Sequence, residues 1–292
     1  MEYSFPRYLL AKQTVDDRAL NRSVLEVLKG RLAGRRIRAI EIGAGMGNML
    51  TRLLSWNVIS QADYIHEDSM AENISFASRW IPEWADGAGM QTQWTGQSEL
   101  RLVDAQRDIR LTLQQQDVFD FIRSKPVPAD LLIAHAFLDL LRLPQSLPEV
   151  LSLTNHLAWF TINFDGLTAF EPTIDPALDD LIVRLYHRTM DDRPSGGDSR
   201  SGRHLLEYLP HFGARVLEAG SSDWIVYPQH GSYPADEAYF LQVILHFFEQ
   251  ALADNPELDS AAFASWLSTR RSQVTRGELI YLAHQLDVVA EV

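Results

Sequence analysis

Residues 38 to 49 read R-A-I-E-I-G-A-G-M-G-N-M, in which a short apolar run is followed by three closely spaced glycines. The apolar residues before the first glycine predict a short strand, and Leu50, Leu53 and Leu54 predict a helix after the last one. A glycine-rich turn between strand and helix lets a ligand approach bare backbone, and the helix start offers unpaired N–H groups. The stretch therefore predicts a site for a nucleotide-like cofactor at the carboxyl edge of a parallel sheet.

Strand and helix patterns alternate from residue 37 to residue 164. The predicted strands cover 37–42, 62–68, 109–116, 130–134 and 158–163, and the predicted helices between them cover 47–56, 71–85 and 147–156. Repeated alternation of this kind indicates an α/β doubly wound sheet with right-handed crossovers.

The flanking segments are mostly helical in period. Helices are predicted at 8–32, 176–190, 203–212, 235–252 and 260–273, with a hairpin within 86–108 and strands within 214–227 and 278–289. We expect one domain over 1–292, with a helical cap at 1–34, a cofactor-binding core at 35–165 and a helical insertion at 229–275. The apolar stripe of 235–273 fits core packing, a lid or a dimer interface.

Composition excludes several classes of protein. The chain has 292 residues, of which 46% are hydrophobic, so it can bury a substantial core. It has no cysteine, which excludes disulfides, thiolate metal sites and a cysteine nucleophile, and no histidine spacing predicts a metal site. A net charge of −13 argues against a nucleic-acid partner. Without an apolar run of membrane length or a signal-peptide pattern, we expect a cytoplasmic protein that contacts no membrane.

Two kinds of cofactor compete for the glycine turn. A dinucleotide site needs G-x-G-x-x-G, but here the glycines are Gly43, Gly45 and Gly47, and Asn48 stands where the third glycine belongs. No P-loop lysine follows. A cofactor without phosphate is the alternative, because the acid at Glu41 would then attract rather than repel it.

The chain resembles the class I S-adenosylmethionine-dependent methyltransferases. Their first motif is an acid-x-G-x-G-x-G turn, matched by 41–47, and their second and third strands end in acids, matched by Asp68 and Asp117. Asp68 is favoured over Glu67 because Ile74 and Ala77 follow at the usual spacing. The resemblance implies a three-layer, seven-stranded, Rossmann-like sheet whose last strand is antiparallel. The predicted helices before Gly277-Glu278-Leu279-Ile280 point to the ubiquinone/menaquinone-biosynthesis-type branch.

The resemblance also implies a set of site residues. Those expected to bind S-adenosylmethionine, and its product S-adenosylhomocysteine, are Glu41, Gly43, Ala44, Gly45, Asp68, Ser69, Asp117, Val118, Phe119 and His135. Candidate catalytic residues at strand ends are His135, Asp139 and Asp165. Candidate substrate contacts are Tyr8, Lys12, Arg18, Asn163, Asp165 and Arg203. Purely structural roles stay open: a turn at 165–166, a helix cap by Asp139 or a surface ion pair by Arg203.

The resemblance implies methyl transfer to an N, O or C atom of a small-molecule acceptor. Such a transfer is an in-line displacement in which the protein supplies alignment and, for some acceptors, a base. An NAD-dependent oxidoreductase and a non-catalytic protein of the same fold are the alternatives. We expect a monomer or homodimer.

Overall fold

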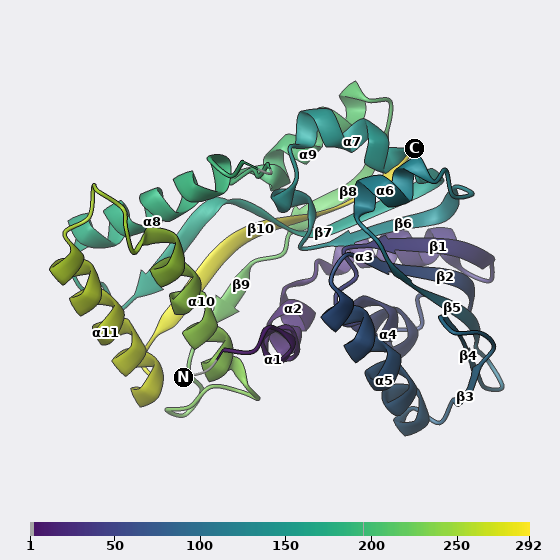
Figure 1. Cartoon of the computed structure of the whole chain (residues 1–292), viewed down its shortest axis with the longest axis horizontal. Coiled ribbons are helices and arrows are strands. Elements are labelled where there is room, and N and C mark those ends of the chain that lie inside the picture. The colour runs from purple at the N-terminus through teal and green to yellow at the C-terminus, as the bar shows by residue number, and fades with distance from the viewer. Residues whose placement is uncertain (1–2, 195) are drawn as a thin grey trace.

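The chain folds around one large mixed sheet. The structure, a computed structural model, describes residues 3–194 and 196–292. Ten strands lie in the order β3-β4-β5-β2-β1-β6-β7-β10-β8, with β9 paired to β10 (Figure 1). Their bounds are β1 Arg36–Ile42, β2 Gln61–Asp68, β3 Gln91–Trp94, β4 Glu99–Val103, β5 Asp108–Gln115, β6 Ala129–His135, β7 Thr154–Glu171, β8 Arg215–Ser221, β9 Trp224–Val226 and β10 Ile280–Glu291.

The strand directions confirm the fold class predicted from the sequence. β5, β2, β1, β6 and β7 are parallel neighbours, whereas β10 runs antiparallel between β7 and β8. In register, Ile42 lies beside both Glu67 and Ala134, so these strands reach their carboxyl ends at one edge of the sheet. The seven-strand Rossmann-like order is extended to ten strands by the β3–β4 hairpin and by β9.

Helices cover both faces of this sheet, as alternation along the strands dictates. Leu131 and Ile133 pack with helices α3, α4 and α5, whereas Leu132 and Ala134 pack with α6, α7 and α9 on the opposite face (Figure 1). The bounds of these helices are α3 Arg22–Leu32, α4 Asn48–Ser55, α5 Ala71–Gly87, α6 Val118–Arg123, α7 Leu143–Leu151 and α9 Ser201–His211. The result is the three-layer arrangement expected.

The strand predicted at 158–163 is much longer than its pattern indicated. β7 continues through Asn163 to Glu171 because β10 pairs with it over this whole length, from Leu157 beside Glu291 to Glu171 beside Ile280. Two residues within the paired stretch have a left-handed backbone, with φ of 56° at Ile162 and 75° at Gly166. The turn considered for 165–166 as a structural alternative is therefore not formed, because both residues lie within β7. The helix predicted at 147–156 is α7, which ends at Leu151 because β7 begins at Thr154.

The far ends of β7 and β10 carry a second hydrophobic core. Phe170 and Tyr281 pack there against helices α8 Pro176–Asp191, α10 Glu237–Leu252 and α11 Ser260–Arg276. The N-terminal segment, predicted as one helical stretch, forms α1 Phe5–Ala11, α2 Gln13–Ala19 and α3. Tyr8 and Val15 join the second core, so α1 and α2 lie between the two parts of the molecule (Figure 1). In the described ranges, no helix combines the length and apolarity needed to span a bilayer.

Candidate functional site

A cavity of about 540 Å³ opens at the carboxyl ends of β1, β2 and β6. Every residue that the sequence assigned to cofactor binding lines it, from the glycine turn to His135. The structure also adds residues to this wall that the sequence did not predict: Glu67, Met70, Asn73, Phe137 and, from the N-terminal helices, Leu9 and Asp16. Glu67 could have been found from its position beside Asp68, but Leu9 and Asp16 carry no motif.

The glycine turn needs glycine for both conformation and space. Gly43 and Gly45 have φ of 59° and 58°, in the left-handed region that side chains disfavour. A Cβ on Gly43 would overlap the ring of Phe137. The amides of the turn point at acids: Gly45 N donates to Asp68 Oδ2 (2.8 Å) and Gly43 N donates to Glu67 Oε2 (3.2 Å). They are therefore not free to cradle a phosphate.

Carboxyl groups dominate the electrostatics of this cavity. Glu41, 1% exposed, accepts a hydrogen bond from Tyr64 Oη (2.6 Å), and burial raises the pKa of Glu41 to about 8. Burial likewise raises the pKa of Glu67 to about 8 and that of Asp68 above its ordinary value. A cation in the cavity would offset this burial penalty, favour the ionised form of these acids and be attracted by it, whereas a phosphate would be repelled.

Asp68 and Asp117 are held in place by backbone amides. Asp68 Oδ1 accepts from Met70 N (2.8 Å) and from Asn73 Nδ2 (3.1 Å), which leaves part of its acceptor capacity open. Asp117 caps α6, and its Oδ1 accepts from Phe119 N (2.9 Å). The same turn places Val118 and Phe119 along the wall. The chain can thus offer fixed acceptors to hydroxyl and amino groups of a ligand.

His135 is held from both ring nitrogens. Its Nδ1 lies 2.8 Å from Thr161 Oγ1 and its Nε2 lies 3.0 Å from Asp16 Oδ2. Burial lowers the pKa of His135 to about 4, so the ring is neutral at physiological pH. These contacts anchor His135 toward α2, and its catalytic role stays a prediction.

Asp16 gathers the charges under the N-terminal helices. Lys12 Nζ lies 3.1 Å from its carboxylate, Arg52 Nη2 lies 3.4 Å away, and Trp224 Nε1 donates to it at 2.9 Å. Although burial opposes ionisation, Lys12 and His135 hold the pKa of Asp16 below its usual range. This cluster fixes α1 and α2 over the cavity.

A second cavity of about 270 Å³ adjoins the first. The two share Phe5, Leu9, Lys12, Ala136 and Leu140 in their walls. Of the predicted catalytic and substrate residues, Tyr8, Lys12 and Asp139 line this second space. Aromatic side chains make up much of the rest of its wall, among them Phe164, Tyr186, Trp224, Phe247 and Tyr281.

Four predicted residues lie outside both cavities. Arg18 pairs with the buried carboxylate of Glu237 (2.6 Å), and Asn163 donates to the Leu286 carbonyl (2.9 Å). Asp165 forms a two-point ion pair with Arg203 (2.8 and 2.9 Å), the structural role left open for that arginine. The physical reason is that β7 does not end at residue 163, so 163 and 165 lie along a strand and not at a strand end.

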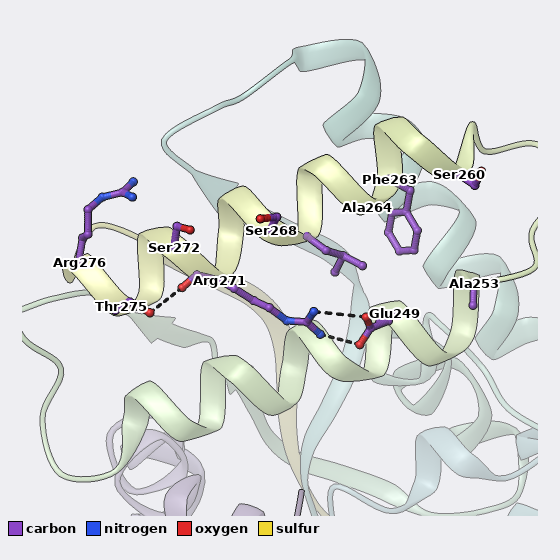
Figure 2. Close-up of a pocket in the computed structure, with 11 residues that line it drawn as sticks. Glu249, Ala253, Ser260, Phe263, Ala264, Ser268, Arg271, Ser272, Thr275 and Arg276 are labelled. Atoms are coloured by element: carbon purple, nitrogen blue, oxygen red, sulfur yellow. Dashed lines mark hydrogen bonds and ion pairs between the residues drawn. The ribbon is translucent and has the colours of Figure 1, made fainter. Parts of the chain in front are cut away.

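A groove lies on helices α10 and α11, away from the glycine turn. Figure 2 shows that Arg271 on α11 spans to Glu249 on α10, and the ion pair measures 2.5 Å. The apolar stripe of these helices, including Phe240, Val243 and Phe248, is buried in the second core. Core packing, one of the three roles considered, is therefore what the stripe does.

Across residues 3–194 and 196–292, no three or more His, Cys, Asp or Glu side chains gather in a way that could hold a metal ion. Two acids of the first cavity, Glu67 and Asp68, instead accept hydrogen bonds from the amides of Gly43 and Gly45.

Comparison with known proteins gives structural likeness without sequence likeness. No protein-family model matches the chain, and no curated protein matches it in sequence. A candidate methyltransferase from Bacillus halodurans aligns with 92% of this chain and 98% of its own, at 10% identity and a TM-score of 0.49. An S-adenosylmethionine-dependent methyltransferase from Thiobacillus denitrificans, in complex with S-adenosyl-L-homocysteine, aligns over 100% of both chains, at 13% identity and 0.46.

Magnesium protoporphyrin IX methyltransferase from Synechocystis, with bound S-adenosylmethionine, aligns with 76% of this chain and 79% of its own, at 12% identity and a TM-score of 0.43. At these scores and identities the likenesses assign no function. The fold is established by the strand order of the chain itself.

Proposed function

We propose that the protein transfers a methyl group from S-adenosylmethionine to a small-molecule acceptor. The observation that carries the proposal is the first cavity, which joins a glycine turn to the carboxyl groups of Glu41, Glu67, Asp68 and Asp117 at the edge of a Rossmann-like sheet. Ligands bind in such sheets at this edge. The helices between β9 and β10 support the ubiquinone/menaquinone-type branch as the finer assignment.

The residues of the cavity fit this cofactor better than a dinucleotide. A pyrophosphate would lie among carboxyl groups, and the turn amides that could bind it are donating to Glu67 and Asp68. A cofactor with a positive charge and no phosphate would instead lie beside hydrogen-bond acceptors along the wall of this cavity. The buried Oδ1 of Asn73, which has no hydrogen-bond partner in the described part of the chain, is one more acceptor on this wall.

When bound, the cofactor supplies an electrophilic methyl group, and the chain supplies the rest. Glu41 would hold the cationic end, Asp68 the ribose hydroxyls and Asp117 the adenine. Phe5, Leu9 and Leu140 line both cavities, so an acceptor in the second would lie next to a cofactor in the first. The adjoining cavity is accordingly the proposed acceptor site. We also propose a cytoplasmic location and a small-molecule partner, in keeping with a chain that has no cysteine and a charge of −13.

Calorimetry tests the cofactor directly. We expect S-adenosylmethionine and S-adenosylhomocysteine to bind at one site and NAD not to bind. Asp68→Ala should weaken both by about tenfold or more, because a hydrogen bond to a charged group contributes roughly 1.5–3 kcal/mol. Asp165→Asn, which alters an acid outside the cavity, should bind like the wild type. Binding of NAD without either sulfur compound would overturn the proposal.

The reaction itself is tested by product mass. The protein is incubated with S-adenosylmethionine carrying a labelled methyl group and a small-molecule extract, and products are screened for the labelled mass increment. Asp68→Ala serves as the negative control. We expect a labelled small molecule that disappears with this variant. Firm cofactor binding without any labelled product would favour a non-catalytic role.

A further inference from the structure

The wall of the second cavity contains a carboxylate with an unused hydrogen-bond acceptor. Asp139, in the short 3-10 helix Leu138–Leu140, lines this cavity. Its Oδ1 is buried and has no hydrogen-bond partner among residues 3–194 and 196–292. The helix-cap role considered for Asp139 is therefore not what its buried oxygen serves. A carboxylate oxygen in such a place is costly unless a ligand completes it.

Three tyrosine hydroxyls lie in the same wall. Tyr8, Tyr186 and Tyr281 come from α1, α8 and β10, and their hydroxyls lie near enough to one another and to Asp139 to act on each other's ionisation. Burial, and to a smaller degree the carboxylates of Asp16 and Asp139, hold the pKa of Tyr8 well above its ordinary value. The hydroxyls are thus neutral, and each can accept a hydrogen bond as well as donate one.

The positively charged side chains in this wall, Lys12 and Arg193, do not neutralise Asp139. Lys12 is paired with Asp16 at 3.1 Å. Arg193 also lines the cavity and acts on Asp139 through its charge, without an ion pair between the two in the described ranges. Burial raises the pKa of Asp139 to about 6, against the opposing charge of Arg193, so the carboxylate is ionised at physiological pH and a better proton acceptor than an ordinary aspartate.

We infer that the second cavity binds an amine, and that the acceptor atom of the proposed methyl transfer is a nitrogen held by Asp139 and the tyrosine hydroxyls. The inference rests on the proposed function. A carboxylate, hydroxyl oxygens and aromatic rings are the groups that bind an ammonium or amine. An oxygen acceptor would have to develop negative charge near Asp139 and Asp16, with Lys12 already paired, which disfavours it.

The bond changes balance for a nitrogen acceptor. An ammonium held by Asp139 first gives one proton to the carboxylate, which frees the nitrogen lone pair. The lone pair then forms the new N–C bond while the C–S bond of the donor breaks, and that bonding pair stays on sulfur. The proton on Asp139 passes to water, and the product leaves as a methylated ammonium. Lys12, held by Asp16, takes no part in this transfer.

Binding of matched probes tests the inference without relying on turnover. Calorimetry on the protein saturated with S-adenosylhomocysteine compares benzylamine with benzyl alcohol, phenethylamine with 2-phenylethanol, and hexylamine with 1-hexanol. We expect at least one amine to bind about tenfold more tightly than its alcohol, since a charge-assisted hydrogen bond is worth at least this factor. Asp139→Asn should reduce that preference to about twofold without changing the affinity for S-adenosylhomocysteine.

Two further variants keep the test decisive. Tyr186→Phe removes only a hydroxyl and should weaken amine binding severalfold, whereas Asp165→Asn, outside both cavities, should leave it unchanged. If no amine is preferred over its alcohol, or if the preference survives Asp139→Asn, the inference is wrong. Failure of the proposed function is separable, because it would appear as absent binding of S-adenosylhomocysteine in the same titrations.

Discussion

Glu41 shows how one buried acid links stability to ligand choice. It lies at the end of β1 next to the glycine turn, bonded only to Tyr64 within the described part of the chain. Its pKa in the folded protein, about 8, lies above the ordinary value of 4.5 because burial disfavours the charge. The folded chain therefore keeps a proton that the unfolded chain releases between these two pH values. The free energy of unfolding that this group contributes is fully present below pH 4.5 and is lost as the pH rises to about 8.

Replacing Glu41 by Gln should remove this pH dependence. We expect Glu41→Gln to unfold in urea with a free energy close to the wild type at pH 5 and higher by on the order of 1–3 kcal/mol at pH 8.5. Glu83→Gln, at an exposed carboxyl of α5, is the control and should show no such trend. The same Glu41→Gln protein should bind S-adenosylmethionine about tenfold more weakly, because a cation loses its counter-charge. A stability difference that is constant with pH would contradict the assignment.

At the scale of elements, α1 and α2 form a cap that is held from two sides. Inside, Asp16 contacts His135 and Arg52. Outside, the buried carboxylate of Glu237 on α10 accepts hydrogen bonds from Thr14 (2.7 Å) and Arg18 (2.6 and 2.9 Å). Leu9, Lys12 and Asp16 wall the first cavity, so loosening of this cap would open that wall.

We expect Glu237→Gln to loosen the cap. It removes a fully buried charge that holds two groups of α2, so backbone amides at 13–19 should exchange hydrogen at least about tenfold faster. S-adenosylhomocysteine should dissociate faster, while the sheet strands keep their protection. Asp236→Asn is the matched control at the neighbouring position: its ion pair with Arg7 is exposed on both sides and contributes little. Equal exchange in the two variants would show that Glu237 does not hold the cap.

The sequence predicted elements well wherever a local pattern set them. Glycines at 43–47 and acids at 68 and 117 follow strands whose apolar runs are buried, so the wall of the first cavity could be assigned residue by residue. The length of β7 could not be predicted, because residues 164–171 are held as a strand by pairing with β10, more than a hundred residues away. Asp16 could not be predicted either, because it is remote from His135 in the sequence and only the fold brings the two side chains together. Asn163 and Asp165 lie outside both cavities for the first of these reasons.

Across the whole molecule, β7 and β10 join the sheet to the second core (Figure 1). Residues of both strands line the second cavity. Asp287 of β10 is the polar group at the crossing point. It is 0% exposed, and its Oδ1 accepts from Ile162 N (2.7 Å) in the irregular part of β7. Its Oδ2 accepts from Asn21 N (2.8 Å) at the start of α3. One carboxylate thus ties three segments that are remote in sequence.

Asp287→Ala should destabilise the protein by about 2 kcal/mol, because it leaves two N–H groups without acceptors, an effect partly offset by removing a buried charge. Asp287→Asn keeps one acceptor oxygen and should cost less. The control is Asp223→Asn, a partly exposed carboxylate that accepts from His284 Nδ1 (2.7 Å) on the same strand and should change stability little. Urea unfolding measures all three variants.

Ile162 also lines the second cavity, so Asp287→Ala should weaken binding there more than binding of S-adenosylhomocysteine in the first cavity. If Asp287→Ala and Asp223→Asn unfold alike, Asp287 does not tie the sheet to the second core.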